Sequence, residues 1–322
     1  MRLTTKHFNQ TAVRTIISAR DLSPLLLEIY AAVSAGELEN HPKFSLPIAA
    51  SSTCLSFFNS MPAYLPRKRY AGIKWVSVKS ENAQLNLPTV MGTIILNDPE
   101  TGYPLAIMDG TWLSSWRTGV TAGMCAEYFS PTDSQVMTVI GPGANSAHAL
   151  NYLLPKLPAL QKVNVIGRTP VRTESFIEQF ATPFPDTAFT QTDIATACAE
   201  SDIVLVSTNA REPLLNGISF KAGACIVGAN GFLDLGTDIL EQVDLLVFDQ
   251  RTTAMKRLQE LSGVDLANRV NTELGEAVNR GYRHDKTRRV LAVPAGMAVI
   301  DLALAAHVYE NASEGVLFDY QA

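Results

Sequence analysis

The feature that most constrains the fold is a glycine-rich turn between an apolar run and a segment with helical spacing, at residues 136–150. The sequence there reads VMTVIGPGANSAHAL, so a β-prone run ends in Gly141-Pro142-Gly143 and continues directly into the helical segment. A strand that turns into a helix through Gly-x-Gly lets the backbone approach a diphosphate, and the free N–H groups of the first helical turn point at it. Gly-Pro-Gly also forms ordinary tight turns, and Ser146 occupies the third glycine position of the fingerprint, so the turn alone leaves both interpretations open.

The second half of the chain alternates short apolar runs with helical segments, which is the spacing of a doubly wound parallel sheet. Strands are predicted at residues 136–140, 163–166, 203–207, 225–227, 245–248 and 290–293, and helices at 144–154, 171–180 and 193–200. This context predicts a Rossmann-type fold for this half and favours the diphosphate interpretation of the turn. We therefore expect Gly141, Gly143, Ala144 and Asn145 to bind a dinucleotide.

The first part of the chain has a different pattern. Residues 11–35 predict a helix or a helix pair, and residues 43–105 carry short alternating runs separated by Pro, Gly and Asn, as in a mostly antiparallel sheet. The segment NDPETG at 97–102 predicts a hairpin turn, and residues 111–129 predict a helix with a stripe of small residues suited to close packing. A last apolar helix is predicted at 298–311, so the fold class is α/β, a Rossmann-type doubly wound sheet plus an α+β domain.

Charge and composition exclude several classes of function. The net charge of −5 gives no general attraction to nucleic acid or to an anionic membrane. The N-terminus lacks an apolar signal-like run and the apolar segment 290–308 is broken by Pro294, Gly296 and Asp301, so a cytoplasmic protein is expected. The cysteines stand far apart in apolar surroundings, with no CxxC pair and no histidine at ligand spacing: Cys54, Cys125, Cys198 and Cys225. They are expected to be buried thiols, and no metal site is predicted.

The residues after the second predicted strand of the Rossmann part bear on the choice of dinucleotide. In this fold an acid at the end of that strand accepts hydrogen bonds from the adenosine ribose, which favours NAD. Here the strand at 163–166 is followed by GRTPVR, in which Arg168, Thr169 and Arg172 suit a 2′-phosphate. The sequence therefore predicts NADPH, with NADH as the weaker possibility. In the alternative, Thr169 only caps the helix that begins at Pro170 and both arginines are solvated.

Longer motifs follow one another along nearly the whole chain. They are MPAYL (61–65), YAGIKWV (70–76), LPTVMGTIILNDPETGYPLAIMDG (87–110), WRTGVTAG (116–123), GPGANS (141–146), LGE (274–276) and GMAVIDLALAAHVYENA (296–312). In this order and spacing they resemble the ornithine cyclodeaminase and mu-crystallin family of amino-acid dehydrogenases, ketimine reductases and cyclodeaminases. The resemblance implies that residues 1–118, completed by 297–322, bind the substrate and form a homodimer, while residues 119–296 bind NAD(P).

The resemblance also implies that basic residues hold the carboxylate of an amino or imino acid against the nicotinamide. By motif match these are Lys43 in HPKFSLP, Lys74 in GIKWV and Arg117 in WRTG, with Thr89 of LPTVM lining the pocket. Physical reasoning agrees, because a guanidinium binds a carboxylate bidentately and a lysine in an apolar strand is disfavoured unless it has a partner or a task. Without the resemblance, Lys74 and Arg117 would be read equally well as solvated or sheet-edge residues.

Asn230 marks a departure from the cyclodeaminases of the family. These, and some dehydrogenases of the family, carry Gly-Ala-Asp or Gly-Ser-Asp after the fifth strand of the nucleotide domain, whereas this chain has Asn230 there. In the cyclodeaminases the aspartate acts on the side-chain amine of the substrate. An amide cannot ionise or act as a general base, so cyclisation of ornithine is disfavoured, with Asp234 as the acid that could substitute in space. Asn230 is still expected to contact substrate and cofactor, and the predicted cofactor site is completed by Ser207, Thr208 and Gly296.

The leading expectation is an NADPH-dependent reductase of a small cyclic imino acid, taking Δ1-pyrroline-2-carboxylate to L-proline and Δ1-piperideine-2-carboxylate to L-pipecolate. Arg117 and Lys43 would hold the substrate carboxylate, and Lys74 would bond to it or keep the imine protonated. Val293-Pro294 replaces the Asp-Ser or Asp-Thr pair usual in the family, which leaves a more apolar pocket suited to a ring. The alternatives are an ornithine cyclodeaminase, an L-alanine or N-methylalanine type of dehydrogenase, and a mu-crystallin-like protein that binds a small ligand.

Overall fold

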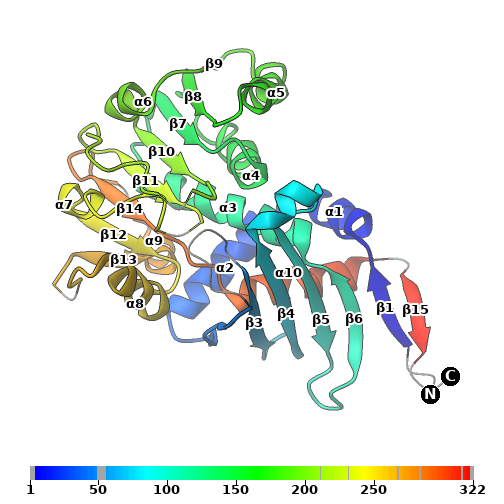
Figure 1. Cartoon of the computed structure of the whole chain (residues 1–322). Coiled ribbons are helices and arrows are strands. Elements are labelled where there is room, and N and C mark those ends of the chain that lie inside the picture. Colours follow the sequence, from blue (N-terminus) through cyan, green and yellow to red (C-terminus); the bar gives the residue numbers. More distant parts are fainter. Residues whose placement is uncertain are drawn as a thin grey trace. The chain divides into compact units, whose positions relative to one another are not determined.

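The computed structural model describes most of the chain. The described residues are 4–48, 56–210, 212–230, 232–266, 268–282, 284–312 and 315–319, without the side chains of residues 83, 253 and 257. Contacts divide the chain into two units, Met1–Arg117 with Gly296–Ala322 and Thr118–Ala295, whose elements are labelled in Figure 1. Over the described ranges, every helix is too short or too polar to cross a membrane.

The first unit consists of a mixed sheet and the helices that pack on it. Its elements are β1 (Thr4–Phe8), α1 (Gln10–Ser18), α2 (Ser23–Ser34), β2 (Phe44–Pro47), β3 (Ser56–Leu65), β4 (Tyr70–Lys79), the 3-10 helix η1 (Ser80–Leu85), β5 (Val90–Asn97), β6 (Pro104–Asp109), α10 (Ala298–Asn311) and β15 (Val316–Asp319). The seven strands follow the order β15-β1-β6-β5-β4-β3-β2. Among these described strands β1 and β6 pair in parallel and the other neighbours pair antiparallel, so the mostly antiparallel sheet predicted from the sequence is confirmed.

Several local predictions in this unit are also confirmed. The helix pair is α1 and α2, and the predicted hairpin turn joins β5 to β6. In that turn the N–H of Gly102 donates to the carbonyl of Asp98 at 2.9 Å, and the Asp98 carboxylate accepts from the N–H of Thr101 at 2.8 Å. The last helix, α10, has the predicted bounds.

Helix α10 lies in the core of the first unit. It packs against β3, β4 and β5 and beside α1 and α2, and its residues from Ala298 to Val308 are all buried. A helix that is apolar nearly all round is stable only when it is covered on every side, which this position provides. The Oδ1 atom of Asn40 accepts from the N–H of Val299 at 3.3 Å and so satisfies one donor at the helix start. Any polar side chain between Ala298 and Val308 is therefore buried with the helix.

The second unit is a doubly wound parallel sheet. Helix α3 (Thr111–Phe129) runs into it from the first unit, and its own elements are β7 (Val136–Ile140), α4 (Ala144–Leu153), β8 (Lys162–Ile166), α5 (Pro170–Ala181), β9 (Ala188–Thr190), α6 (Ile194–Glu200), β10 (Ile203–Val206), β11 (Cys225–Gly228), α7 (Ile239–Gln242), β12 (Leu245–Phe248), α8 (Arg251–Ser262), β13 (Asn271–Glu273), α9 (Leu274–Arg280) and β14 (Val290–Ala292). The strand order is β13-β12-β14-β11-β10-β7-β8-β9, with all described pairs parallel. The predicted Rossmann-type fold is confirmed.

The chain order of these strands locates the expected binding edge. Strand β7 lies between β8 and β10, so the sheet grows first to one side of β7 and then to the other. In sheets of this kind ligands bind outside the carboxyl ends of the strands at such a reversal. The turn after β7 and the residues after β10 therefore lie where a dinucleotide is expected. All residues of β10 and β12 are buried, as their unbroken apolar runs predict.

The stripe of small residues on α3 packs against α4. A Cβ atom added at Gly119 would lie 2.5 Å from Cβ of His148 and 3.0 Å from the backbone N of Ala149. One added at Gly123 would lie 2.7 Å from Cδ1 of Tyr152. Side chains at either glycine would push the two helices apart, so the close packing predicted from the sequence is confirmed.

The cysteine prediction is confirmed where the structure describes the residue. Cys125, Cys198 and Cys225 are buried free thiols, and burial raises the pKa of each. Cys54 lies outside the described residues. The three described thiols therefore act as small apolar side chains in the core of the second unit.

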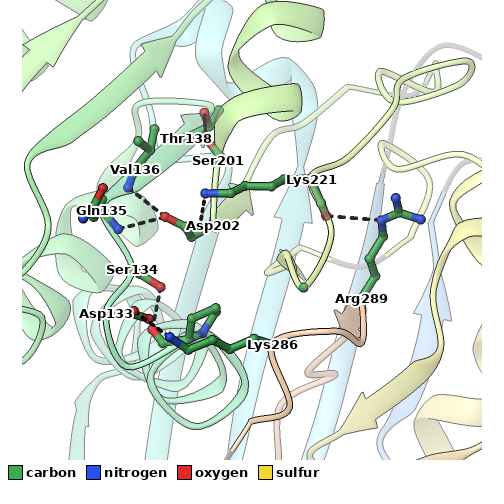
Figure 2. A network of polar contacts seen from close by, with 12 residues as sticks. Asp133, Ser134, Gln135, Val136, Thr138, Ser201, Asp202, Lys221, Lys286 and Arg289 are labelled. Atoms are coloured by element: carbon green, nitrogen blue, oxygen red, sulfur yellow. Dashed lines mark hydrogen bonds and ion pairs between the residues drawn. The ribbon is translucent and has the colours of Figure 1, made fainter.

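A network of polar contacts links the amino ends of β7, β10 and β14 in the second unit through Lys221, which lies in the segment before β11 (Figure 2). Oδ2 of Asp202, just before β10, accepts from the backbone N–H groups of Gln135 at 2.8 Å and Val136 at 3.1 Å. Oδ1 accepts from Nζ of Lys221 at 2.5 Å, and the carbonyl of Lys221 accepts from Nε of Arg289 at 3.2 Å. This edge is opposite the one where ligands bind in such sheets, so the network is expected to contribute to stability.

Asp202→Ala should lower the free energy of unfolding by about 1–3 kcal/mol, because two partly buried backbone N–H groups and the ammonium of Lys221 would lose their acceptor. Urea denaturation followed by circular dichroism measures the change. Asp133→Ala is the matched control: its carboxylate pairs with Lys286 at 2.5 Å on the exposed surface, and its loss should leave the midpoint unchanged. A wild-type midpoint for Asp202→Ala would refute a stabilising role for the network.

Candidate functional site

Three charged side chains form a buried cluster in the first unit. Lys74 is on β4, Asp301 is in the first turn of α10 and Arg117 is on α3. Nζ of Lys74 lies 2.5 Å from Oδ2 of Asp301, and Nε of Arg117 lies 3.1 Å from Oδ1. The side chains of Lys74 and Asp301 are 1% exposed and that of Arg117 is 11% exposed. One carboxylate thus bridges two cations, with a separate oxygen for each.

Local structure explains why these side chains meet. Successive residues of β4 alternate between the two faces of the sheet, with Lys74 and Val76 buried and Trp75 exposed. The buried face is the one that packs against α10, which carries Asp301. At the start of α3 the carboxylate of Asp109 accepts from the N–H of Trp112 at 3.0 Å, which fixes the turn from β6 into the helix. Arg117 follows within two turns of that cap.

The electrostatics of the cluster make Lys74 titrate near neutral pH. Burial lowers the pKa of Lys74 to about 7; the charges of Arg117 and Lys43 also lower it, and Asp301 opposes them. Burial would raise the pKa of Asp301, but Arg117 and Lys74 outweigh this effect and hold the pKa of the carboxyl below its usual value. At neutral pH Asp301 is therefore ionised, and Lys74 is close to the midpoint of its titration. Such an amine can act as a general acid or base.

Two further predicted residues lie near this cluster. Lys43 is half-buried just before β2 and close enough to Lys74 to lower its pKa. Gly296 has φ +80°, and a Cβ atom there would lie 2.9 Å from Nη2 and 3.0 Å from Cζ of Arg117. The backbone of Gly296 therefore packs against the guanidinium, a contact that the sequence did not indicate when Gly296 was assigned to the cofactor.

Thr89 lies apart from the cluster. It stands just before β5, half-buried, and its carbonyl accepts from the N–H of Lys79 at 2.7 Å. Lys79 is five residues along β4 from Lys74, which corresponds to about 17 Å of extended strand. The structure therefore does not bring Thr89 into contact with Lys74.

The glycine-rich turn of the second unit has the geometry of a backbone cradle. Gly141 has φ +92°, and a Cβ atom there would lie 2.9 Å from both the carbonyl carbon of Ser207 and Cγ2 of Thr208. Oγ of Ser146 donates to the carbonyl of Gly141 at 2.7 Å and closes the turn. Gly143 is the N-cap of α4, which begins at Ala144, and nothing lies within 4 Å of where its Cβ would be. The turn leaves open space at the helix start, which fits a diphosphate.

A chain of hydrogen bonds joins this turn to the ends of β10 and β11. Nδ2 of Asn145 donates to Oδ1 of Asn230 at 2.9 Å, and Nδ2 of Asn230 donates to the carbonyl of Thr208 at 3.1 Å. The N–H and hydroxyl of Thr208 donate to Oδ2 of Asp234 at 3.3 and 2.8 Å. Asp234 is 3% exposed and burial raises its pKa. Asn145, Asn230, Ser207 and Thr208 are thus gathered at one place, and the Asp234 carboxylate is engaged with Thr208.

The basic residues after β8 are exposed. Thr169 is the N-cap of α5, but its side chain makes no capping hydrogen bond. Arg168 and Arg172 lie on either side of it at the surface, and over the described ranges neither forms an ion pair with a carboxylate. Thr169 therefore begins α5 without using its hydroxyl as a cap, and the two arginines add uncompensated positive charge beside the start of the helix.

Sequence reasoning missed Asp301, which appeared there only as an interruption of the last apolar segment. Asp301 is the single acid in the buried part of α10, from Ala298 to Val308, and its position is informative because an isolated buried carboxylate is costly. Such a residue needs a cationic partner, and Lys74 is already notable in the sequence as a charged residue in an apolar strand. Pairing the buried acid with this lysine would have predicted the cluster.

Comparisons with known proteins agree with the motifs and the fold. The profile of the ornithine cyclodeaminase/mu-crystallin family matches residues 5–316. An alanine dehydrogenase of Archaeoglobus fulgidus is 29% identical over 317 residues, 94% of each chain, and a Δ1-pyrroline-2-carboxylate reductase of Bacillus cereus is 25% identical over 79% of this chain and 81% of that protein. The structure of Thermococcus litoralis Δ1-pyrroline-2-carboxylate reductase in complex with NADH and L-proline superposes with a TM-score of 0.81 at 24% identity, covering 95% of this chain and 97% of that one. The chain belongs to the ornithine cyclodeaminase/mu-crystallin family.

Proposed function

We propose that the protein is an NADPH-dependent ketimine reductase that converts Δ1-pyrroline-2-carboxylate to L-proline, with Δ1-piperideine-2-carboxylate to L-pipecolate as a second reaction. The observation that carries the proposal is the buried cluster of Lys74, Asp301 and Arg117, because it combines a guanidinium with an amine whose pKa is about 7. A cyclic imino acid needs both: a cation for its carboxylate and an acid for its nitrogen. Relatives named as Δ1-pyrroline-2-carboxylate reductases support this choice.

In the proposed reaction the first unit binds the substrate. Arg117 and Lys43 hold the carboxylate of the ring, and the protonated Lys74 gives its proton to the imine nitrogen. A bound nicotinamide supplies the hydride to the imine carbon, so the ring gains one hydride and one proton and becomes the secondary amine. The residues contribute mainly by orientation in a buried site, where charge–charge interactions are strong.

The second unit is proposed to bind the dinucleotide. The open turn at Gly141 and Gly143 and the start of α4 suit the diphosphate, and a Cβ at Gly143 would extend into the space that it needs. Arg168, Thr169 and Arg172 suit the 2′-phosphate of NADPH, since they are exposed and free of carboxylate partners within the described part of the chain.

The position of Asn230 supports reduction over cyclisation. Its amide oxygen accepts from Asn145 and its amide nitrogen donates to the carbonyl of Thr208, so both ends of the side chain hold the loop. A cyclodeaminase would need an acid at this position. Asp234 does not supply one in this arrangement, because its carboxylate is buried against Thr208.

The proposal is tested by following NADPH absorbance with five- and six-membered cyclic imino acids, without added amine. We expect oxidation with the cyclic imines and much slower oxidation with pyruvate plus methylamine. A preference for the open-chain pair would favour a dehydrogenase of the alanine type. Tight NADPH binding without turnover of any imine would favour a ligand-binding protein.

Replacing Arg168 and Arg172 together by alanine should lower kcat/KM for NADPH by about tenfold to a hundredfold and leave kcat/KM for NADH unchanged. At this exposed site the charge-assisted hydrogen bonds of the two arginines to the 2′-phosphate are together worth about 1.5–3 kcal/mol, and about 1.4 kcal/mol is tenfold. The measurement is steady-state kinetics with each cofactor. Arg14→Ala, an exposed arginine on α1, is the control. An equal loss with both cofactors would show that these arginines do not read the 2′-phosphate.

A further inference from the structure

We propose that Asp301 is a positioning residue for the reaction, whose carboxylate holds Lys74 and Arg117 together as one fixed pair. The inference deepens the proposed function and rests on it only for the identity of the reaction. The contacts themselves lie within the first unit, and the main test below reads Lys74 directly.

The geometry of the carboxylate fixes both partners. Oδ2 accepts from Nζ of Lys74 at 2.5 Å and Oδ1 accepts from Nε of Arg117 at 3.1 Å. Because a guanidinium is planar, a bond at Nε also fixes the direction in which its two Nη groups point. The backbone of Gly296 packs against Cζ and Nη2 of the same group. The guanidinium of Arg117 is therefore fixed at Nε by the carboxylate of Asp301 and at Cζ and Nη2 by the backbone of Gly296.

The position of Asp301 in the fold makes it a rigid support. It lies in the first turn of α10, where the N–H of Val299 is satisfied by Asn40, and the helix is buried along nearly its whole length. A helix N-terminus favours a negative charge, so the backbone of α10 and the two cations favour the ionised carboxylate together. A side chain that is 1% exposed on a packed helix has little freedom to move.

The charges around Lys74 give Asp301 a second effect. The charged groups that act on Lys74 are Arg117 on α3, Lys43 before β2 and Asp301 on α10. Burial, Arg117 and Lys43 all favour the neutral amine, and Asp301 alone among these groups favours the ammonium. Without the carboxylate charge, Lys74 would lose its proton at lower pH and would be neutral when the substrate needs an acid.

The test compares Asp301→Asn with the wild-type protein by a pH titration of ε-13C-labelled lysine, followed by NMR, with the Lys74 signal assigned from its absence in Lys74→Met. We expect the titration midpoint of Lys74 to fall by about one to three pH units in Asp301→Asn. Glu310→Gln is the matched control, because Glu310 is on the same helix and pairs with Lys68 at 2.8 Å near the surface. It should leave the Lys74 midpoint in place. An unmoved midpoint in folded Asp301→Asn overturns the proposal.

A second variant gives a shift of opposite sign and keeps the test decisive if Asp301→Asn does not fold. Arg117→Met removes the like charge and leaves Lys74 and Asp301 as a neutral pair, so the midpoint of Lys74 should rise by about one pH unit or more. Because losing the like charge raises the midpoint by itself, the double variant Arg117→Met/Asp301→Asn is titrated beside it. If Asp301 holds the ammonium of Lys74, the midpoint of the double variant should lie below that of Arg117→Met, and equal midpoints overturn the proposal.

Kinetics separate a positioning role from a merely structural one. In Asp301→Asn, KM for the cyclic imino acid should rise because Arg117 loses its support, and the pH at which kcat is half-maximal should move by the shift that NMR measures. A structural role would lower kcat without moving its pH dependence, and that result overturns the proposal. If the wild-type protein reduces no imine, the proposed function fails, while the Lys74 titration still decides the role of Asp301.

Discussion

Arg117→Ala should lower kcat/KM for Δ1-pyrroline-2-carboxylate by about two to three orders of magnitude. Removing one partner of a buried, hydrogen-bonded charge pair costs about 2–5 kcal/mol. Here the substrate carboxylate would lose its guanidinium, and Asp301 would lose one of its two cations. The measurement is the initial rate of NADPH oxidation over a range of imine concentrations.

The control for this variant is Arg67→Ala. Arg67 is in the same unit and pairs with Glu37 at 3.0 Å, but its side chain is 77% exposed. Its loss should leave kcat/KM unchanged, since exposed ion pairs contribute little. Turnover of Arg117→Ala at the wild-type rate would rule out the assigned role of Arg117.

The second large effect is expected from Lys74. In the proposed reduction the protonated amine would be the active form, so kcat/KM should fall about tenfold per pH unit above a pKa of about 7. Lys74→Met should lower the rate by about 100- to 10,000-fold and abolish this pH dependence. The measurement is a pH profile of kcat/KM from about pH 6 to about pH 9. A wild-type profile that is flat across this range would contradict the role of Lys74.

The same titration has a consequence for stability. A lysine in the unfolded chain keeps its proton up to its ordinary pKa of 10.5, whereas burial lowers the pKa of Lys74 in the folded protein to about 7. Between these values the unfolded chain binds more protons, so the contribution of Lys74 to stability increases as pH rises through that window. Lys74→Met should remove this slope from the free energy of unfolding measured by urea denaturation at several pH values. Lys79→Met, on the same strand and bonded to Ser56 at 2.7 Å, should retain it.

Elements with complete apolar periodicity were predicted from the sequence. Strands β7 and β12 and helices α3 and α10 have the predicted bounds, because their burial follows from their own residues. The missed elements are short or polar. Helix α8 reads RTTAMKRLQELS, with few apolar positions, and β9 and β13 have three residues each. Strand β1, TTKHF, shows no apolar run and is held by its pairing with β6 and β15.

The candidate site likewise has parts that the sequence predicts and parts that it does not. The glycine turn and the arginines after β8 are each made of residues close together in the sequence, so the sequence alone predicted them. The partnership of Lys74 with Asp301 spans 227 residues and that of Arg117 with Asp301 spans 184, so only the fold brings them together. The contact of Gly296 with Arg117 is of the same kind. The sequence indicated which residue types belong to the site, but it did not predict which distant residues contact one another.

The most direct test of the proposed function is a balance of NADPH and ammonia during turnover. We predict that one NADPH is oxidised for each L-proline formed from Δ1-pyrroline-2-carboxylate, with ammonia neither consumed nor released. Release of ammonia from ornithine without net NADPH oxidation would instead identify a cyclodeaminase. Uptake of ammonia or methylamine with pyruvate, at a rate above that with the cyclic imine, would identify a dehydrogenase of the alanine type, and either result would contradict the assignment of the buried cluster to a cyclic ketimine.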